Sequence, residues 1–339
     1  DAVRQTREAA ATAKLVGLLT EKKPLDPTEA WLEYRPYPRA GWKTRLRAGA
    51  FYPPMSLESR ALGWETPYTI TPSAIGSWIG EEIRTVGLEA QVDWLGTRLG
   101  HAFDFELTAA AFGWNDPAGT MLALHGWAMH DRQTTLSGRV GAPQRDIGLA
   151  KKELFAEIDD RPGYYVGARA RYHDRAILNV LHYDKRADPA VYEAELRDYA
   201  WLTKFDAAAL RIETATDWTV IAQALIGETY IAPDHFWLDW KFASQSLMLA
   251  RRRGAHMLAA RYDRFDVEFM GARDAPGSED GHAWTIAYTF APDGPWRFAL
   301  EWLRLTSDVP ARAMSPGDNP LVTETKIELS ARYLLQGTL

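Results

Sequence analysis

Apolar and polar residues alternate over long stretches of this 339-residue chain. Successive side chains of a β-strand point to opposite faces, so the alternation predicts strands with one apolar and one polar face. Between residues 282 and 290, the apolar side chains on one face are Trp284, Ile286, Tyr288 and Phe290. The same pattern recurs at 85–94, 296–302 and 326–335, often over more than the ~5–6 residues usual in soluble sheets. The alternation therefore predicts an all-β chain of long strands.

The connections between the predicted strands alternate between short turns and long polar stretches. Short turns such as 173–175 and 292–295 are followed by longer stretches such as 185–197 and 271–281. A barrel in an outer membrane has this rhythm, because its tight turns lie at the periplasmic end and its longer loops at the external end. We therefore predict a transmembrane antiparallel up-and-down β-barrel of about 14 strands, formed as a single domain over residues 1–339.

Counting back from the last strand gives the expected positions of the strands. They are 322–335, 296–308, 282–291, 255–269, 236–252, 216–231, 199–213, 176–187, 163–173, 101–114, 82–95, 42–53, 29–37 and 10–20. A further hairpin at 121–129 and 148–158 would raise the count to 16. For residues 1–26, the Ala-rich composition leaves both strand and helix open. The chain begins at Asp1 without a methionine, which we interpret as a mature, processed chain.

The apolar faces of the predicted strands are expected to meet lipid. Trp and Tyr residues gather near strand ends, as at Trp31, Trp94, Trp218 and Trp296, and such rings suit a lipid–water boundary. The opposite faces carry more charges than a dry core accommodates, and no helical layer is predicted to cover the sheet. The alternative is a soluble β-rich carbohydrate-active enzyme or binding protein, whose apolar faces would point inward.

The composition narrows the classes further. The chain is 46% hydrophobic and 25% charged, which excludes a disordered protein. Its net charge of −6 argues against nucleic acid as a partner. It has no cysteine, which suits an oxidising compartment. No apolar run reaches the ~18 residues that a membrane-spanning helix needs.

One short motif resembles a known family. The run Gly49 to Glu58 reads Gly-Ala-Phe-Tyr-Pro-Pro-Met-Ser-Leu-Glu. It is similar to the strand end and loop entry of phosphate-selective-type bacterial outer-membrane porins, where an aromatic residue precedes Pro-Pro-x-x-Leu-Glu. The final strand, whose alternation ends at Tyr333, resembles the C-terminal signal of outer-membrane proteins. The lysine-rich ladder of phosphate-selective members is not present, so the resemblance implies the porin architecture and does not extend to selectivity for phosphate.

This resemblance and the strand pattern together imply a function and its partners. We expect an outer-membrane porin that allows passive diffusion of small hydrophilic, in part anionic, solutes through a water-filled lumen. It would lie in the bacterial outer membrane, against its lipid and lipopolysaccharide, and a homotrimer is consistent with porins of this kind. No nucleic acid, cofactor or metal is expected.

If the apolar faces point outward, alternation assigns the charged residues of the lumen. Eight are basic and four are acidic, which favours anions if the charges act freely; the alternative is that they pair across neighbouring strands. The predicted pore-lining residues are Arg45, Arg47, Glu89, Asp93, Arg169, Arg171, Lys241, Arg297, Glu301, Lys326, Glu328 and Arg332.

Two long connections, at about 54–81 and 115–162, are candidates to narrow the lumen. A barrel of this size is too wide for its own wall side chains to fill, and both connections carry many apolar residues. The alternative is an external cap or a subunit contact. The constriction candidates are Trp64, Tyr68, Trp78, His125, Trp127 and His130.

Signatures of catalysis are weak in this sequence. The nucleophile elbow Gly-x-Ser-x-Gly and Gly-rich phosphate loops are not found. His125 and His130 lack a metal-ligand spacing, and Asp274, Glu279 and Asp280 lack the spacing of a calcium loop. A glycoside hydrolase needs a pair of carboxylates, but no pair stands out. The chain is therefore not expected to be an enzyme.

Overall fold

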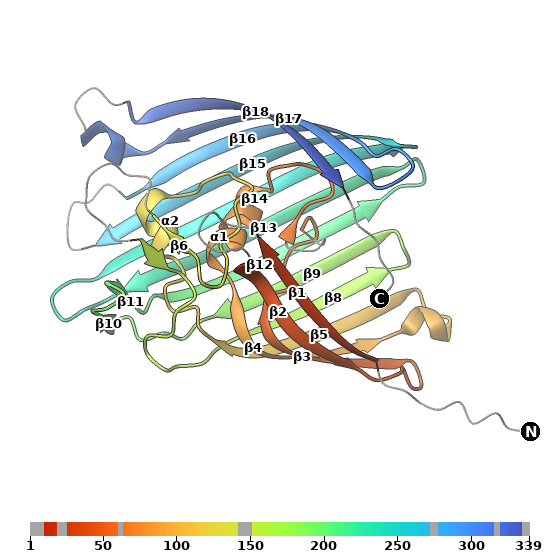
Figure 1. Ribbon diagram of the computed structural model, residues 1–339, viewed down its shortest axis with the longest axis horizontal. Helices are drawn as coiled ribbons and strands as arrows, with labels where there is room; N and C mark the ends of the chain where they lie inside the picture. The colour runs from red at the N-terminus through yellow and green to blue at the C-terminus, as the bar shows by residue number, and fades with distance from the viewer. Residues whose placement is uncertain are drawn as a thin grey trace, which may run out of the picture.

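The computed structural model describes residues 10–18, 26–59, 64–141, 151–271, 277–314 and 319–333. Fourteen strands form one antiparallel sheet, and each pairs with the next in chain order. Figure 1 shows the sheet curved around enclosed segments, with β1 and β2 in front of β12 and β13. The strands are β1 (Ala10–Leu18), β2 (Asp26–Arg35), β3 (Trp42–Phe51), β4 (Thr85–Trp94), β5 (Phe103–Gly113), β8 (Gly163–Tyr172), β9 (Ala176–Asp184), β12 (Leu202–Glu213), β13 (Trp218–Ile231), β14 (Leu238–Arg253), β15 (His256–Gly271), β16 (Glu279–Phe290), β17 (Trp296–Asp308) and β18 (Leu321–Tyr333).

The predicted all-β, up-and-down topology is confirmed, with 14 strands in the sheet. Residues 10–18 form a strand, so the strand alternative holds for that part of the start of the chain. The additional hairpin does not join the wall. Instead, α2 covers Thr120–His125, and β7 (Lys152–Glu153) pairs with β6 (Arg139–Val140) in a separate sheet. Among the described residues, no hydrogen-bonded pairing joins β1 to β18.

Side chains alternate between an apolar outer face and an inner face that is largely buried. On β4, Leu88 is 67% exposed whereas its neighbour Glu89 is 2% exposed. On β16, Ile286 is 45% exposed whereas Thr285 is fully buried. Exposed apolar side chains recur on strand after strand, which is the pattern of a barrel wall in lipid. No helix among the described residues has the length and apolarity needed to cross a bilayer.

The wall has a low side and a tall side. The low wall, β2–β5 and β8, has strands of 10 or 11 residues, and its outward alternating positions carry no charge in the described residues. The tall wall comprises β12–β17, with strands of 12 to 16 residues. Towards the long-loop end, the outer face of the tall wall and of the neighbouring β9 carries a charged belt. Pairs in this belt are His182–Asp206 at 2.8 Å, Lys204–Glu228 at 2.8 Å and Arg264–Asp280 at 3.6 Å.

Two connections fold into the space that the sheet encloses. The first inward loop, residues 52–84 between β3 and β4, contains α1 (Ala74–Glu82). The second inward loop, residues 114–162 between β5 and β8, contains α2. Figure 1 shows α1 within the curve of the sheet. All nine residues of α1 are buried, so the helix is a core element and not a surface cap.

Candidate functional site

The first inward loop is attached to one wall strand after another across the interior. Asn179 on β9 donates to the carbonyl oxygens of Pro54 and Met55, each at 3.0 Å. Further along the loop, the backbone N–H groups of Ile70 and Thr71 donate to Glu301 on β17, at 2.6 and 3.0 Å. These bonds tie the loop to opposite parts of the wall and hold it across the lumen.

A buried charge network holds the middle of the same loop. Arg261 on β15 is 1% exposed and donates to Glu58 of the loop at 3.0 Å and to Asp263 at 2.7 Å. Its other bonds include the carbonyl oxygens of Thr71 and Pro72. A buried guanidinium with this many partners satisfies its donors without water. The loop therefore depends on one wall arginine for its position.

The helix α1 packs against the wall through aromatic rings. Ser73 caps its N-terminus by accepting from the N–H of Gly76 at 3.1 Å. The Trp78 ring lies 5.1 Å from Phe242 and 5.5 Å from Phe205, measured between centroids. Trp127 of the second inward loop meets Trp78 at 5.8 Å. The interior on the β12–β15 side is therefore filled with apolar side chains.

The two inward loops form one unit through adjacent glutamates at the end of α1. Glu82 accepts from the backbone N–H groups of Gly119, Met121 and Leu122 at the start of α2, and from the Trp78 indole. Glu81 lies 3.3 and 3.2 Å from the Nε2 atoms of His125 and His130, and also pairs with Arg132. The position of the Glu82 carboxylate at the N-terminus of α2 is favourable, because the first N–H groups of a helix have no partner within the helix.

Burial moves the pKa values of two groups in this unit in opposite directions. Desolvation raises the pKa of Glu82 to about 7. Desolvation, with the charge of His125, lowers the pKa of His130 to about 4. Between these pH values the folded chain holds a proton on Glu82 that the unfolded chain releases. The contribution of Glu82 to the free energy of unfolding therefore falls as the pH rises from 4.5 to about 7. The unfolded chain protonates His130 below about pH 6.5, whereas the folded chain does so only near pH 4. The contribution of His130 to the free energy of unfolding therefore falls as the pH falls.

These opposing terms predict that replacing Glu82 and replacing His130 change the pH dependence of stability in opposite directions. Glu82→Gln removes the carboxylate term and should be about 2 kcal/mol more stable at pH 7 than at pH 5, relative to the wild-type profile. His130→Asn should show the reverse slope. Urea unfolding at both pH values measures this. Parallel profiles for all three proteins would contradict the assignment.

Most predicted pore-lining residues face inward, with one exception. Lys241 lies on the outer face of β14, because its neighbours Trp240 and Phe242 are the buried, inward residues. The prediction for Lys241 was therefore wrong: the upper interior is filled with apolar loop residues, which reverses the polarity of the two faces there. The inward residues are Arg45, Arg47, Glu89, Asp93, Arg169, Arg171, Arg297, Glu301, Lys326, Glu328 and Arg332.

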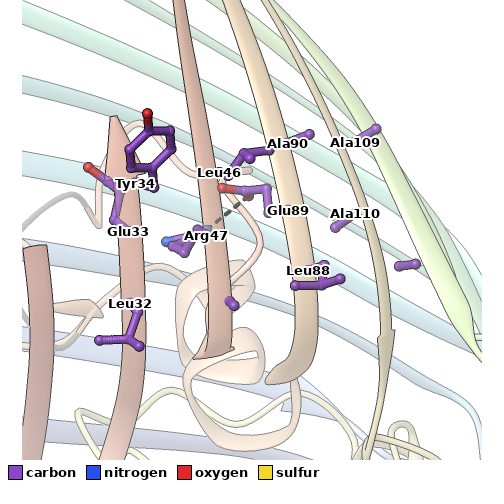
Figure 2. Close-up of a pocket in the computed structure, with 12 residues that line it drawn as sticks. Leu32, Glu33, Tyr34, Leu46, Arg47, Leu88, Glu89, Ala90, Ala109 and Ala110 are labelled. Carbon is purple, nitrogen blue, oxygen red and sulfur yellow. Dashed lines mark hydrogen bonds and ion pairs between the residues drawn. The ribbon is translucent and has the colours of Figure 1, made fainter. Parts of the chain in front are cut away.

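These inward charges are mostly paired, as the second alternative predicted. Glu89 accepts from Arg45 and Arg47, each at 2.9 Å, and from the hydroxyl of Tyr165. Figure 2 shows the Arg47–Glu89 bond between β3 and β4. The other pairs include Lys43–Asp93, Arg169–Glu106, Arg171–Asp104, Lys326–Glu328 and Arg332–Glu65. Arg297 donates only to carbonyl oxygens among the described residues.

The six constriction candidates all lie in the inward loops. Trp64, Tyr68, Trp78 and Trp127 are less than 10% exposed. The side chains of His125 and His130 are 8% and 20% exposed, facing Glu81. The sequence interpretation missed the residues that anchor these loops, which are Glu58, Glu82, Asn179, Gln223, Arg261 and Asp263. Arg261 and Asp263 do share the inward face of β15, so alternation could have identified them.

One group of carboxylates has the separation that a metal ion would need. Asp116, Glu157 and Asp159 offer oxygens within 4.8 Å of one another. The ammonium of Lys185, which is fully buried, pairs with Asp116 and lies 4.0 Å from the other two. Burial raises the pKa of Glu157. The lysine supplies the positive charge that a cation would bring, so the cluster acts as a link between loops.

The outer surface of the low wall contains a shallow apolar depression of about 800 Å³. Figure 2 shows Leu46, Leu88, Ala90 and Ala109 around it, from three neighbouring strands. Alanines and leucines make up most of its lining, namely Ala48, Ala90, Ala109, Ala110, Ala111, Leu32, Leu46 and Leu88. It lies on the outer face and is not part of the lumen.

Comparisons with known proteins bear on the fold. No protein-family model matches the chain, and no curated protein matches it. Its structure is similar to OmpTΔL8, a loop L8 deletion mutant of the Vibrio cholerae outer membrane protein OmpT, at 10% identity and a TM-score of 0.53, covering 96% of this chain and 85% of that one. The anion-selective porin from Comamonas acidovorans gives 11% identity and a TM-score of 0.43, covering 96% and 99%. The first likeness shows that the chain has the fold of an outer-membrane β-barrel.

Proposed function

We propose that the chain is a porin of the bacterial outer membrane that lets small hydrophilic solutes diffuse through a narrowed lumen. The fold, the exposed apolar outer wall and the polar inner face support this proposal. The two inward loops act as the constriction, with Trp64, Tyr68, Trp78, His125, Trp127 and His130 in the narrowing element. Passive diffusion involves no chemical step and needs no cofactor, so we propose a channel and not an enzyme.

One observation carries the proposal and supports a particular path for the solute. Inward charged side chains on β3, β8 and β18 remain exposed: Lys43 is 29%, Arg171 38% and Lys326 40% exposed. On the tall wall, by contrast, the inward loops cover Phe205, Phe242 and Arg261 completely or nearly so. Water reaches the first group and not the second. The solute path therefore runs beside the inward loops, along β18 and the low wall.

Diffusion of uncharged sugars into liposomes tests the proposal. Vesicles that contain the purified chain should swell in isotonic solutions of small sugars, and the rate should fall as the sugar becomes larger. Protein-free vesicles are the control. A chain that inserts but passes no sugar would contradict a diffusion channel.

The charges along the path predict its selectivity. Arg45, Arg47, Arg169 and Arg171 lie beside carboxylates that they neutralise, so the wild type should prefer anions only mildly. Replacing all four by Gln leaves the carboxylates uncompensated, and the cation-to-anion permeability ratio should rise several-fold. The reversal potential under a salt gradient measures the ratio. The outward pair Arg253 and Arg264, replaced by Gln, is the control, and an unchanged ratio in the quadruple variant would contradict the lumen assignment.

We extend the proposal to the surroundings of the barrel. Lipid and lipopolysaccharide would contact the outer wall, with the charged belt at the headgroups of the outer leaflet. In a homotrimer, the uncharged low wall is the surface best suited to another copy, since its alanine-lined depression allows close approach. Resemblance of residues 49–58 to phosphate-selective-type porins supports membership of that wider group and does not extend to selectivity for phosphate.

A further inference from the structure

A recess of about 370 Å³ lies at the short-turn end of the interior, against β12–β15. The first inward loop closes it from above. There, Leu57 and Tyr68 pack with Ile221, Met248 and Met257 in a buried apolar cluster. The first inward loop blocks the further passage of a solute that enters this recess from the periplasmic end. The recess is therefore separate from the path along β18 and the low wall, and it is suited to binding and not to transit.

The recess offers charges of both signs that the protein leaves available. Arg252 lines it, and within the described residues its guanidinium contacts only the Met257 sulfur, at 3.5 Å. Arg211 and Glu213 also line the recess, but they pair with each other. Asp217 lines the same recess, and its carboxylate forms no ion pair in the described part of the chain.

The remaining carboxylate is already committed. Glu58 borders the recess, but it accepts from Arg261 and Gln223, each at 3.0 Å, and from the N–H of Ser73. The available groups are therefore the Arg252 guanidinium and the Asp217 carboxylate. A simple anion would leave Asp217 unpaired beside it, and a simple cation would leave Arg252 unpaired. A ligand with both charges matches the set.

We propose that this recess binds a small zwitterion, namely an amino acid or a short peptide with an apolar side chain. Its carboxylate pairs with Arg252, and its ammonium group pairs with Asp217. Its apolar side chain packs against Leu57 and Tyr68. The volume lies within the range of small-molecule sites. This inference rests on the fold and not on conduction, so it stands or falls separately from the proposed channel.

Calorimetric titration of the full chain in detergent micelles with leucyl-leucine tests this site. We expect saturable binding of one peptide per chain. N-acetyl-leucyl-leucine, which lacks the ammonium group, and leucyl-leucinamide, which lacks the carboxylate, should each bind at least about tenfold more weakly, since each loses a charge-assisted bond. Equal binding of all three would overturn the proposal, as would no saturable heat up to about 10 mM peptide.

Two variants assign the binding to the named groups. Arg252→Gln and Asp217→Asn should each weaken leucyl-leucine binding at least about tenfold. Arg253→Gln changes the next residue of β14, whose side chain is on the outer face, and should keep the wild-type affinity within about twofold. Both test residues lie at the rim, so the variants should retain the wild-type thermal unfolding profile. If both variants unfold like the wild type and also bind leucyl-leucine with unchanged affinity, the assigned site is contradicted.

Discussion

Arg261→Met should unfold at markedly lower urea concentration than the wild type, with a loss of about 3–5 kcal/mol in the free energy of unfolding. The substitution leaves Glu58 and Asp263, which are 1% and 0% exposed, as buried carboxylates without their common cation. It also removes bonds to the backbone of the first inward loop. The loop should lose its fixed position, so channels that still form should show larger and noisier conductance.

Two further variants separate this effect from a general loss of charge. Arg264→Met removes an arginine three residues along the same strand, but its side chain is 57% exposed on the outer face, so it should cost less than about 1 kcal/mol. Adding Glu58→Gln to Arg261→Met removes one stranded carboxylate and should recover part of the stability. Equal stability of the Arg261 and Arg264 variants would show that the buried network does not hold the loop.

Ile286→Arg should destabilise the chain in a bilayer by about 2–4 kcal/mol. Ile286 projects from the outer face of β16 between Trp284 and Tyr288, and its cross-strand neighbours are Ala260 and Trp302. This position lies in the middle of the apolar band, where a guanidinium meets hydrocarbon. Leu88→Arg on β4 should behave in the same way, since Leu88 is 67% exposed on the outer face. Equilibrium unfolding by urea in lipid vesicles measures both costs.

The depth of the charge provides the control. Thr323→Arg places the same side chain on the outer face of β18 near its long-loop end, and should cost no more than about 1 kcal/mol. A soluble protein that used this face as an exposed surface would tolerate arginine equally at all three positions. Such a result would contradict a wall in contact with lipid.

Alternation of apolar and polar residues predicted the wall well because each strand obeys it locally. Strand number, direction and the outward face of residues such as Leu88 and Ile286 follow from the chain itself. The same rule misplaced Lys241. Near the long-loop end of the tall wall, the inner face carries Trp240, Phe242 and Phe265, which belong to the main buried apolar cluster, while the outer face carries Lys241 and Asp266. In this region the inward side chains are apolar because they pack in an apolar interior, so the polarity of a residue does not show whether it faces the lumen or the outside.

The position of the inward loops could not be predicted from the pattern of neighbouring residues. Their apolar content indicated that they are not freely solvated, but the partners that hold them are distant in sequence. Arg261 and Glu58 are separated by 203 residues, and Glu301 and Ile70 by 231. Such pairings depend on the curvature of the whole sheet, which no single segment encodes. The capping of α2 by Glu82 likewise requires both loops to be in place.

Single-channel recording of the detergent-purified chain in a planar bilayer tests the central claim most directly. A barrel with a water-filled path beside its inward loops predicts stepwise increases in conductance as single molecules insert, with a mild preference for anions under a salt gradient. A chain that stays soluble without detergent and produces no conductance steps would contradict the account of a lipid-facing wall around a channel.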